Sequence, residues 1–153
     1  MSIAYYDSNN AMDPSLVDEQ AQQAAKSFFP DNSQSEDGKG RSKEGKGRSE
    51  EGKGQSKEIA LNSSQLRKFY SDVKTLERRW LSMGGDDQAF AQIIPMIKLL
   101  KAKSDYALKR KVVPSSFKAW LWNHVDSIKT SRDFKAFLLH FEAVVGFSYK
   151  FFD

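Results

Sequence analysis

The chain has 153 residues, no cysteine and a formal net charge of +4, so it allows one ordinary domain or a smaller domain with a tail. The lack of cysteine excludes a disulfide framework and a thiolate metal site, and it suits a reducing cytosol. No apolar run approaches the roughly 20 residues of a membrane span, and the N-terminus lacks the features of a signal peptide, so we expect a soluble cytoplasmic protein without a membrane partner.

Residues 1–58 predict a low-complexity, disordered tail. Asp13 and Pro14 suit the start of a short helix over residues 14–28, but its apolar stripe is thin, so this helix is either marginal in isolation or docks on a partner. Residues 38–58 then contain three copies of a seven-residue GKGxSxE unit. The unit has no apolar residue for a coiled-coil seam, and its glycines disfavour a helix, so it predicts a flexible, near-neutral linker.

The stretch from Leu61 to Trp80 predicts the first helix of the folded region. Asn62 suits its N-cap, and Gln65 follows three residues later, as in a capping box. Apolar residues at helical spacing predict the buried face: Leu66, Phe69, Tyr70, Val73, Leu76 and Trp80. Basic residues align on another face: Arg67, Lys74 and Arg78. A helix of this kind can bury one side and offer cations to a polyanion on the other.

The second helix is expected to begin at Asp86 or Asp87 and to end near Lys111. Its buried face is predicted at Phe90, Ile93, Ile94, Ile97, Leu100, Ser104 and Ala107. Because Pro95 removes a backbone donor, we expect a kink or a break in the helix just before it. The interruption from Leu81 to Asp87 is longer than the turn of a helix-turn-helix motif, which disfavours that motif.

Two further helices are expected after Pro114. Ser115 or Ser116 suits the N-cap of the first, and Ser131 suits the N-cap of the second. Their apolar stripes run from Phe117 to Ile128 and from Phe134 to Tyr149. Since no stretch alternates convincingly with period two, the sequence predicts an all-α fold, a small bundle of about four to five helices over residues 59–153 that follows the flexible tail.

The sequence shows no catalytic constellation. His124 lies on the apolar side of its helix and is expected to be a core histidine, and His140 has no second histidine at metal-ligand spacing. There is neither a Gly-x-Ser-x-Gly motif nor a cysteine nucleophile. We therefore predict no catalytic residues, no metal site, no cofactor and no enzymatic activity.

Positive charge is concentrated in the first half of the folded region. Residues 59–111 hold 11 Lys and Arg against 5 Asp and Glu, a net charge of +6. Residues 1–58 hold 8 against 11, or −3, and residues 112–153 hold 5 against 4, or +1. Cations on two successive helices, with Tyr70 and Tyr106 nearby for stacking, favour binding to the nucleic-acid backbone without sequence readout.

Three segments together resemble a known family. They are SQLRKFY at residues 64–70, LKAKSDYA at 100–107 and FEAVVGF at 141–147. In this order and at these separations they resemble the small helical subunit of type III-A CRISPR effector complexes, the Csm small-subunit family. The similarity covers about Leu61 to Asp153, and the GKGxSxE repeat is not part of the family pattern.

The resemblance implies a role in a ribonucleoprotein. Members of this family stack head to tail in several copies, contact the duplex of crRNA and target RNA, and leave nuclease and cyclic oligoadenylate chemistry to the backbone and large subunits. Carried over to this chain, the implied partners are crRNA, target RNA, other copies of the chain and those subunits. The implied RNA contacts are Gln65, Arg67, Lys68, Lys74, Lys101, Lys103, Lys109, Arg110 and Lys111.

The sequence therefore supports one hypothesis and leaves alternatives open. The hypothesis is a noncatalytic RNA-binding assembly subunit of a type III-A CRISPR surveillance complex in antiviral defence. The alternative is a helical adaptor whose basic surface binds acidic proteins. Arg67 also has a structural alternative, an ion pair with Asp105 or another acid. Copy number, the oligomeric state in isolation and the role of the repeat do not follow from the sequence.

Overall fold

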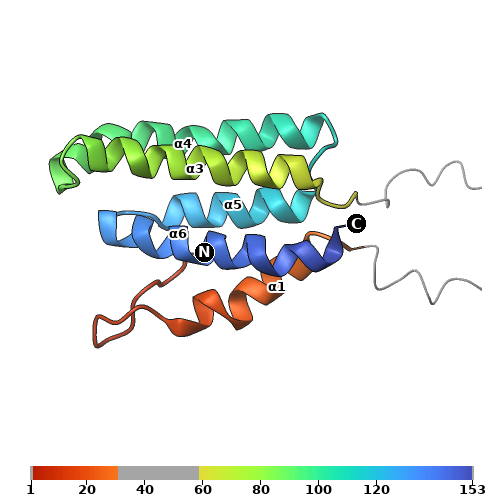
Figure 1. Ribbon diagram of the computed structural model, residues 1–153, viewed down its shortest axis with the longest axis horizontal. Coiled ribbons are helices and arrows are strands. Elements are labelled where there is room, and N and C mark those ends of the chain that lie inside the picture. Colours follow the sequence, from red (N-terminus) through yellow and green to blue (C-terminus); the bar gives the residue numbers. More distant parts are fainter. Residues whose placement is uncertain (1, 31–58, 153) are drawn as a thin grey trace, which may run out of the picture.

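The computed structural model describes residues 2–30 and 59–152, and within these ranges the chain is helical (Figure 1). The described elements are the 3₁₀ helix η1 (Pro14–Val17), α1 (Glu19–Ser27), α3 (Ser63–Ser82), α4 (Asp87–Lys109), α5 (Ser115–Ser127), α6 (Ser131–Ser148) and the 3₁₀ helix η5 (Tyr149–Phe151). The predicted all-α fold is confirmed, since these ranges contain five α-helices and no strand. The GKGxSxE repeat lies outside the described residues.

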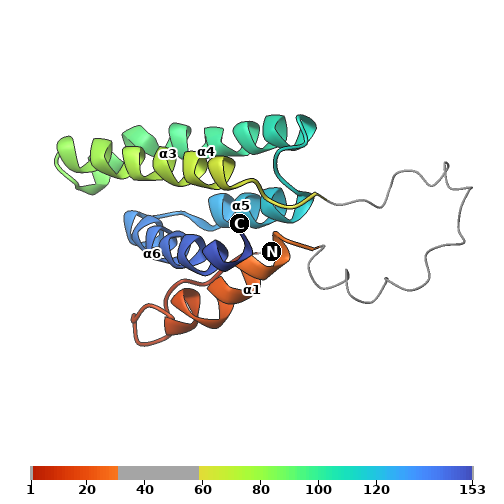
Figure 2. The same cartoon turned by 45° about the vertical axis from the view of Figure 1, so that its right-hand side comes forward.

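The helices form stacked layers. α3 and α4 run antiparallel as a hairpin, α5 and α6 lie beneath them, and α1 covers the other side of the α5–α6 layer (Figures 1 and 2). α3 packs mainly on α4 and α6, α4 packs on α5, and α1 packs on α6 and α5. The α3–α4 hairpin and α1 therefore lie on opposite sides of the α5–α6 layer. None of the helices described here is both long and apolar enough to cross a bilayer.

The start and the buried face of α3 agree with the sequence pattern. The Asn62 side-chain oxygen accepts the backbone N–H groups of Ser64 at 2.9 Å and Gln65 at 3.3 Å, which caps the helix. Five of the six predicted apolar residues are buried, and the sixth, Tyr70, is half-buried with its ring edge-on to Phe141. The apolar spacing of α3 is thus satisfied by α4, α6 and the rest of the core.

The connection between α3 and α4 is shorter than predicted. α3 ends at Ser82 and α4 begins at Asp87, and the Asp86 carboxylate caps α4 by accepting the Ala89 N–H at 2.9 Å. Gly84, at φ 114°, supplies a backbone conformation that glycine tolerates best. The interruption therefore has the length of a helix-turn-helix turn, but the side-by-side antiparallel packing in Figure 1 differs from the steep crossing of that motif.

α4 continues through Pro95, so the predicted break is absent. Proline cannot donate to the carbonyl four residues earlier, which belongs to Ala91. Both Ala91 and Pro95 lie on the exposed side of the helix, where water can bond to the carbonyl that lacks its partner. Apolar residues of α4 pack against the core on both sides of position 95, among them Ile93 and Ile97, and this packing keeps the two halves in one helix.

The N-caps of α5 and α6 each lie one residue or more before the predicted serines. Pro114 occupies the N-cap of α5 and makes no side-chain capping bond. Thr130 caps α6, because its hydroxyl accepts the Asp133 N–H at 3.2 Å while the Asp133 carboxylate accepts the Thr130 N–H at 3.1 Å. This reciprocal pair is a capping box. Threonine and serine are both good caps, so their adjacency at residues 130 and 131 made the choice ambiguous.

Residues 2–30 belong to the packed core, which differs from the prediction that residues 1–58 form a tail. Leu16 and Phe28 are fully buried, and Phe28 packs edge-on against Phe117 and Trp120 with ring centroids 5.3 and 5.5 Å apart. The surface on which this segment docks is α5 and α6 of the same chain. The Leu61 N–H also donates to the Phe28 carbonyl at 2.9 Å, so the residues that flank 31–58 lie side by side.

Candidate nucleic-acid interface

Three of the predicted RNA-contacting lysines form ion pairs within the chain. The pairs are Lys74 with Glu77 (2.8 Å), Lys101 with Asp126 (2.7 Å) and Lys103 with Asp72 (3.3 Å). The hydrogen bond that Lys74 donates to Glu77 is the main reason that the pKa of Lys74 is raised, and the bond that Lys101 donates to Asp126 lowers the pKa of Asp126. Their charges are partly compensated, which makes these lysines weaker candidates for contacts to phosphate.

The five other predicted cations form no ion pair with any described residue. They are Arg67, Lys68, Lys109, Arg110 and Lys111, and all are exposed. Because α3 and α4 are antiparallel, the start of α3 and the end of α4 meet at one end of the bundle (Figure 1). At about 100° per residue, the helical members of this set point away from the core. We call these five residues the cationic end.

Lys101 has a second structural role, in the seam between α4 and α5. The Trp122 indole N–H donates to the Ser104 hydroxyl at 2.9 Å. The Nζ atoms of Lys101 and Lys118 lie 4.6 and 4.8 Å from the centroid of the Trp122 ring. Trp122, whose partner did not follow from the sequence, therefore fastens α5 to α4 through a hydrogen bond and two cation–π contacts.

Asp105 is bonded to a different cation from the one considered in the sequence. Its carboxylate pairs with Lys118 at 2.7 Å, across the α4–α5 seam. Arg67 forms no ion pair with any acid in residues 2–30 and 59–152. The structural alternative for Arg67 is thus not realised, and its guanidinium remains available to a partner.

Lys111 is held in a strained backbone conformation at the end of α4. Its φ is 64°, in the left-handed region that favours glycine. The Lys111 N–H donates to the Leu108 carbonyl at 2.9 Å, and the Val112 N–H donates to the Ala107 carbonyl at 3.1 Å. These two bonds form a Schellman motif, in which glycine is the usual residue at the position of Lys111. A lysine there costs about 1 kcal/mol relative to glycine.

Tyr106, Tyr70 and Gln65 differ in how much of each side chain is accessible to a ligand. Tyr106 is 66% exposed, and the Arg110 guanidinium carbon lies 5.6 Å from its ring centroid. Tyr70 instead packs against Phe141, which leaves it little open ring surface. Gln65 is half-buried in the first turn of α3. Of the two predicted stacking residues, Tyr106 is therefore the better placed.

Both histidines are buried and hydrogen-bonded, which the sequence predicted for His124. Burial lowers the pKa of His124 well below its ordinary value, and repulsion from His140 adds to the shift. Burial also lowers the pKa of His140, against an opposing hydrogen bond to the Leu16 carbonyl. Among the described residues, no group of three or more histidines and acids is arranged to hold a metal ion.

Comparison with known proteins assigns the chain to a family. The sequence profile of the family described as Csm2 Type III-A matches residues 45–152, well over half of the chain. The match begins inside the GKGxSxE repeat, earlier than the resemblance at Leu61 indicated, and it leaves out residues 2–30. No curated protein and no solved structure matches the chain. By the family match, this chain belongs to the Csm2 Type III-A family and is a subunit of a type III-A CRISPR complex.

Proposed function

We propose that this subunit is a noncatalytic RNA-binding assembly protein, which stacks in several copies and contacts the duplex of crRNA and target RNA. The observation that carries the proposal is the cationic end: five exposed Lys and Arg residues from α3, α4 and the turn after α4, without an ion-pair partner in the described chain. Unpaired cations clustered at one end of a bundle favour phosphate contacts over internal ion pairs.

The chemistry of the cationic end fits the backbone of a duplex rather than its bases. Arg67 and Arg110 can each bond a phosphate with two N–H groups, while Lys68, Lys109 and Lys111 act as point charges. Because contacts to phosphate carry no sequence information, they would hold guide and target strands without reading sequence. Lys74, Lys101 and Lys103 would add a weaker, long-range field around this end.

Self-stacking needs apolar surface as well as charge. Leu81 and Met83, at the tip of the hairpin, are 54% and 41% exposed, and Leu99 on α4 is 52% exposed. These side chains are candidates for contacts with the next copy or with the backbone and large subunits, because isolated apolar side chains gain from burial at an interface. We assign no reaction to this subunit and expect the chemistry of the complex to belong to its partners.

The test is charge reversal at two residues of the cationic end. The double variant Arg67→Glu/Lys68→Glu is compared with the wild-type chain in binding to a fluorescent RNA duplex of ~20 base pairs over a range of salt concentrations. We expect affinity to fall at least tenfold at low salt, and the slope of log K against log salt to decrease by about 1 to 2, as for the loss of two phosphate contacts.

The matched control is Lys129→Glu/Lys135→Glu, which makes the same charge change at two exposed lysines beside and on α6. This control should bind the duplex within about threefold of the wild type, since its effect is only long-range and screened. Equal binding by the Arg67/Lys68 variant and the wild type, with both folded by circular dichroism, would refute the assignment. An adaptor for acidic proteins would then be favoured.

A further inference from the structure

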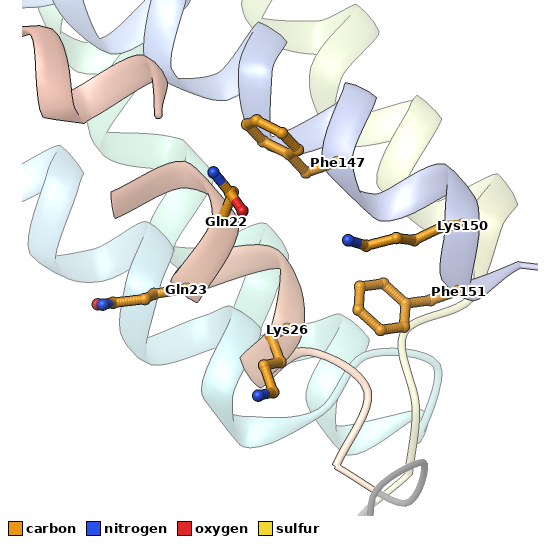
Figure 3. A pocket seen from close by; sticks show the side chains of 6 residues that line it. All are labelled: Gln22, Gln23, Lys26, Phe147, Lys150 and Phe151. Carbon is orange, nitrogen blue, oxygen red and sulfur yellow. The ribbon is translucent and has the colours of Figure 1, made fainter. Parts of the chain in front are cut away.

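A groove separates α1 from the C-terminal part of α6, on the side of the molecule opposite the hairpin. It encloses about 440 Å³ and is lined by Gln22, Gln23, Lys26, Phe147, Lys150 and Phe151. Figure 3 shows Gln22, Gln23 and Lys26 on α1, and Phe147, Lys150 and Phe151 on α6 and η5. Gln22 extends toward Phe147, whereas Gln23 points away from it. Neither the family match nor the proposed function assigns a role to this groove.

The charge of the groove is positive and uncompensated. Lys26 and Lys150 are exposed and form no ion pair with the described residues, and no carboxylate lines the groove. Two other surface hollows differ in this respect. One contains Asp87, and the other contains the ion pair between Lys103 and Asp72. The lining of the α1–α6 groove is therefore suited to an anion.

The aromatic lining adds a flat apolar surface beside these cations. The Phe151 ring stacks on the Phe29 ring, with centroids 4.7 Å apart and an angle of 14° between the ring planes. This contact fixes the position of Phe151. Phe147 is half-buried and has no aromatic partner among the described residues. Aromatic rings of this kind stack well with nucleobases, at little cost in conformational freedom.

Gln22 adds a polar side chain to the groove, on the side that Phe147 lines (Figure 3). The Gln22 amide donates to Asp18 at 2.7 Å within α1. The Gln23 side chain is exposed and makes no hydrogen bond to a described residue, but its amide extends from α1 away from Phe147, Lys150 and Phe151 (Figure 3). An amide recognises the edges of unpaired bases, which a duplex keeps inside its own helix.

Helix-end stabilisation explains only part of this arrangement. Lys26 lies in the last turn of α1 and Lys150 in the last turn of η5, where cations interact favourably with the helix dipole. That role does not require the phenylalanines Phe147 and Phe151 in the same groove lining. An acidic peptide would match the lysines, but it has no planar group matched to Phe147 unless it carries an aromatic side chain.

We propose that the α1–α6 groove binds single-stranded RNA, with a base stacked on Phe147 and the adjoining phosphates bonded to Lys26 and Lys150. α1, which lines the groove, and the α3–α4 hairpin, which carries most of the cationic end, lie on different sides of the α5–α6 layer (Figures 1 and 2). One chain can therefore hold a duplex at the hairpin and a single strand at α1–α6. This inference goes beyond the proposed function and does not depend on it.

The test measures binding of the full chain to a fluorescent ten-nucleotide oligouridylate. The variant Lys26→Glu/Lys150→Glu should lose at least tenfold in affinity, with a salt slope about 1.4 smaller, as for two lost contacts to a single strand. Phe147→Leu keeps the apolar bulk but removes the stacking face, and it should lose about fivefold without a change in the salt slope. The matched control is again Lys129→Glu/Lys135→Glu, which should bind like the wild type.

Photo-crosslinking then locates the bound strand. With 5-iodouridine in the oligonucleotide, we expect the major crosslinked peptide to contain Phe147. Three results would each overturn the proposal. They are crosslinks confined to the hairpin, an equal loss of affinity in Lys26→Glu/Lys150→Glu and in the control Lys129→Glu/Lys135→Glu, and full competition by a polyglutamate peptide. Since Arg67→Glu/Lys68→Glu is assayed on duplex RNA and Lys26→Glu/Lys150→Glu on a single strand, failure at one site is distinguishable from failure at the other.

Discussion

The α3–α4 hairpin and the layer formed by residues 2–30 with α5 and α6 use polar groups in opposite ways. In the hairpin and the turn after it, five of the cations that the sequence singled out are exposed and have no ion-pair partner in the described chain. The other layer buries polar side chains and bonds them to one another. The five unpaired cations of the hairpin therefore do not hold the fold together through ion pairs within the described chain, whereas the buried polar groups of the other layer do so through hydrogen bonds.

A buried network fastens the N-terminal segment to α5 and α6. The His140 ring accepts the Trp120 indole N–H at 3.0 Å and bonds to the Leu16 carbonyl at 2.6 Å through its other nitrogen. The Tyr5 hydroxyl bonds to His124 at 2.8 Å, and the two histidine rings stack with centroids 4.5 Å apart. Residues 2–30 thus contribute to the core although the family profile does not cover them.

The largest expected difference between the two regions is in unfolding stability. Phe28→Ala removes a fully buried ring, and we expect it to lower the free energy of unfolding by about 3 to 5 kcal/mol. Leu99→Ala in the hairpin removes a side chain that is 52% exposed, and it should change the free energy of unfolding by less than about 0.5 kcal/mol. Urea unfolding of both variants measures the contrast, and a Phe28 variant as stable as the wild type would show that residues 2–30 are dispensable.

The buried histidines of the α5–α6 layer should make the free energy of unfolding depend on pH. Unfolded histidines bind protons as the pH falls below about 6.5, whereas burial lowers the pKa of His124 and His140 in the folded chain. Their contribution to stability is therefore complete above pH 6.5 and is lost as the pH falls. Urea unfolding at pH 5 should give a free energy about 1 to 3 kcal/mol below that at pH 7.5. An equal or higher stability at pH 5 would contradict the buried network.

At the end of the hairpin, Lys111 should lower the stability of the fold and raise its affinity for RNA. Lys111→Gly relieves the backbone strain at φ 64° and should raise the free energy of unfolding by about 0.5 to 1 kcal/mol. The same change removes one cation from the cationic end, so affinity for the RNA duplex should fall about two- to fivefold. Lys111→Ala serves as a control that loses the charge without relieving the strain. A glycine variant that binds RNA as well as the wild type would remove Lys111 from the interface.

The apolar spacing was sufficient to predict most of the described fold. The buried faces of α3 and α4, the N-cap Asn62 and the start of α4 at Asp86 or Asp87 agree with the sequence, because helical periodicity and capping are local properties. The docking of residues 2–30 was missed, because it depends on tertiary contacts made by Tyr5, Leu16 and Phe28, which a thin helical stripe does not reveal.

The sequence predicted which cations belong to the candidate site, but not which of them pair with acids of the same chain. Charge counts located the cations, but they could not show that Lys74, Lys101 and Lys103 have acidic partners in the chain while Arg67 has none. Lys103 and Lys101 find their partners on α3 and α5 respectively, through packing that only the fold defines. The α1–α6 groove was not predicted at all, since its lining residues come from segments more than 100 residues apart in the chain.

The central claim is that the cationic end holds this subunit on RNA. The most direct measurement is purification of the tagged full-length chain from host cells that contain the whole complex, followed by sequencing of the RNA that accompanies it. We predict repeat-spacer guide RNA with the wild type and with Lys129→Glu/Lys135→Glu, and at least tenfold less of it with Arg67→Glu/Lys68→Glu. Absence of guide RNA from the wild-type preparation, or equal amounts with all three chains, would contradict the account.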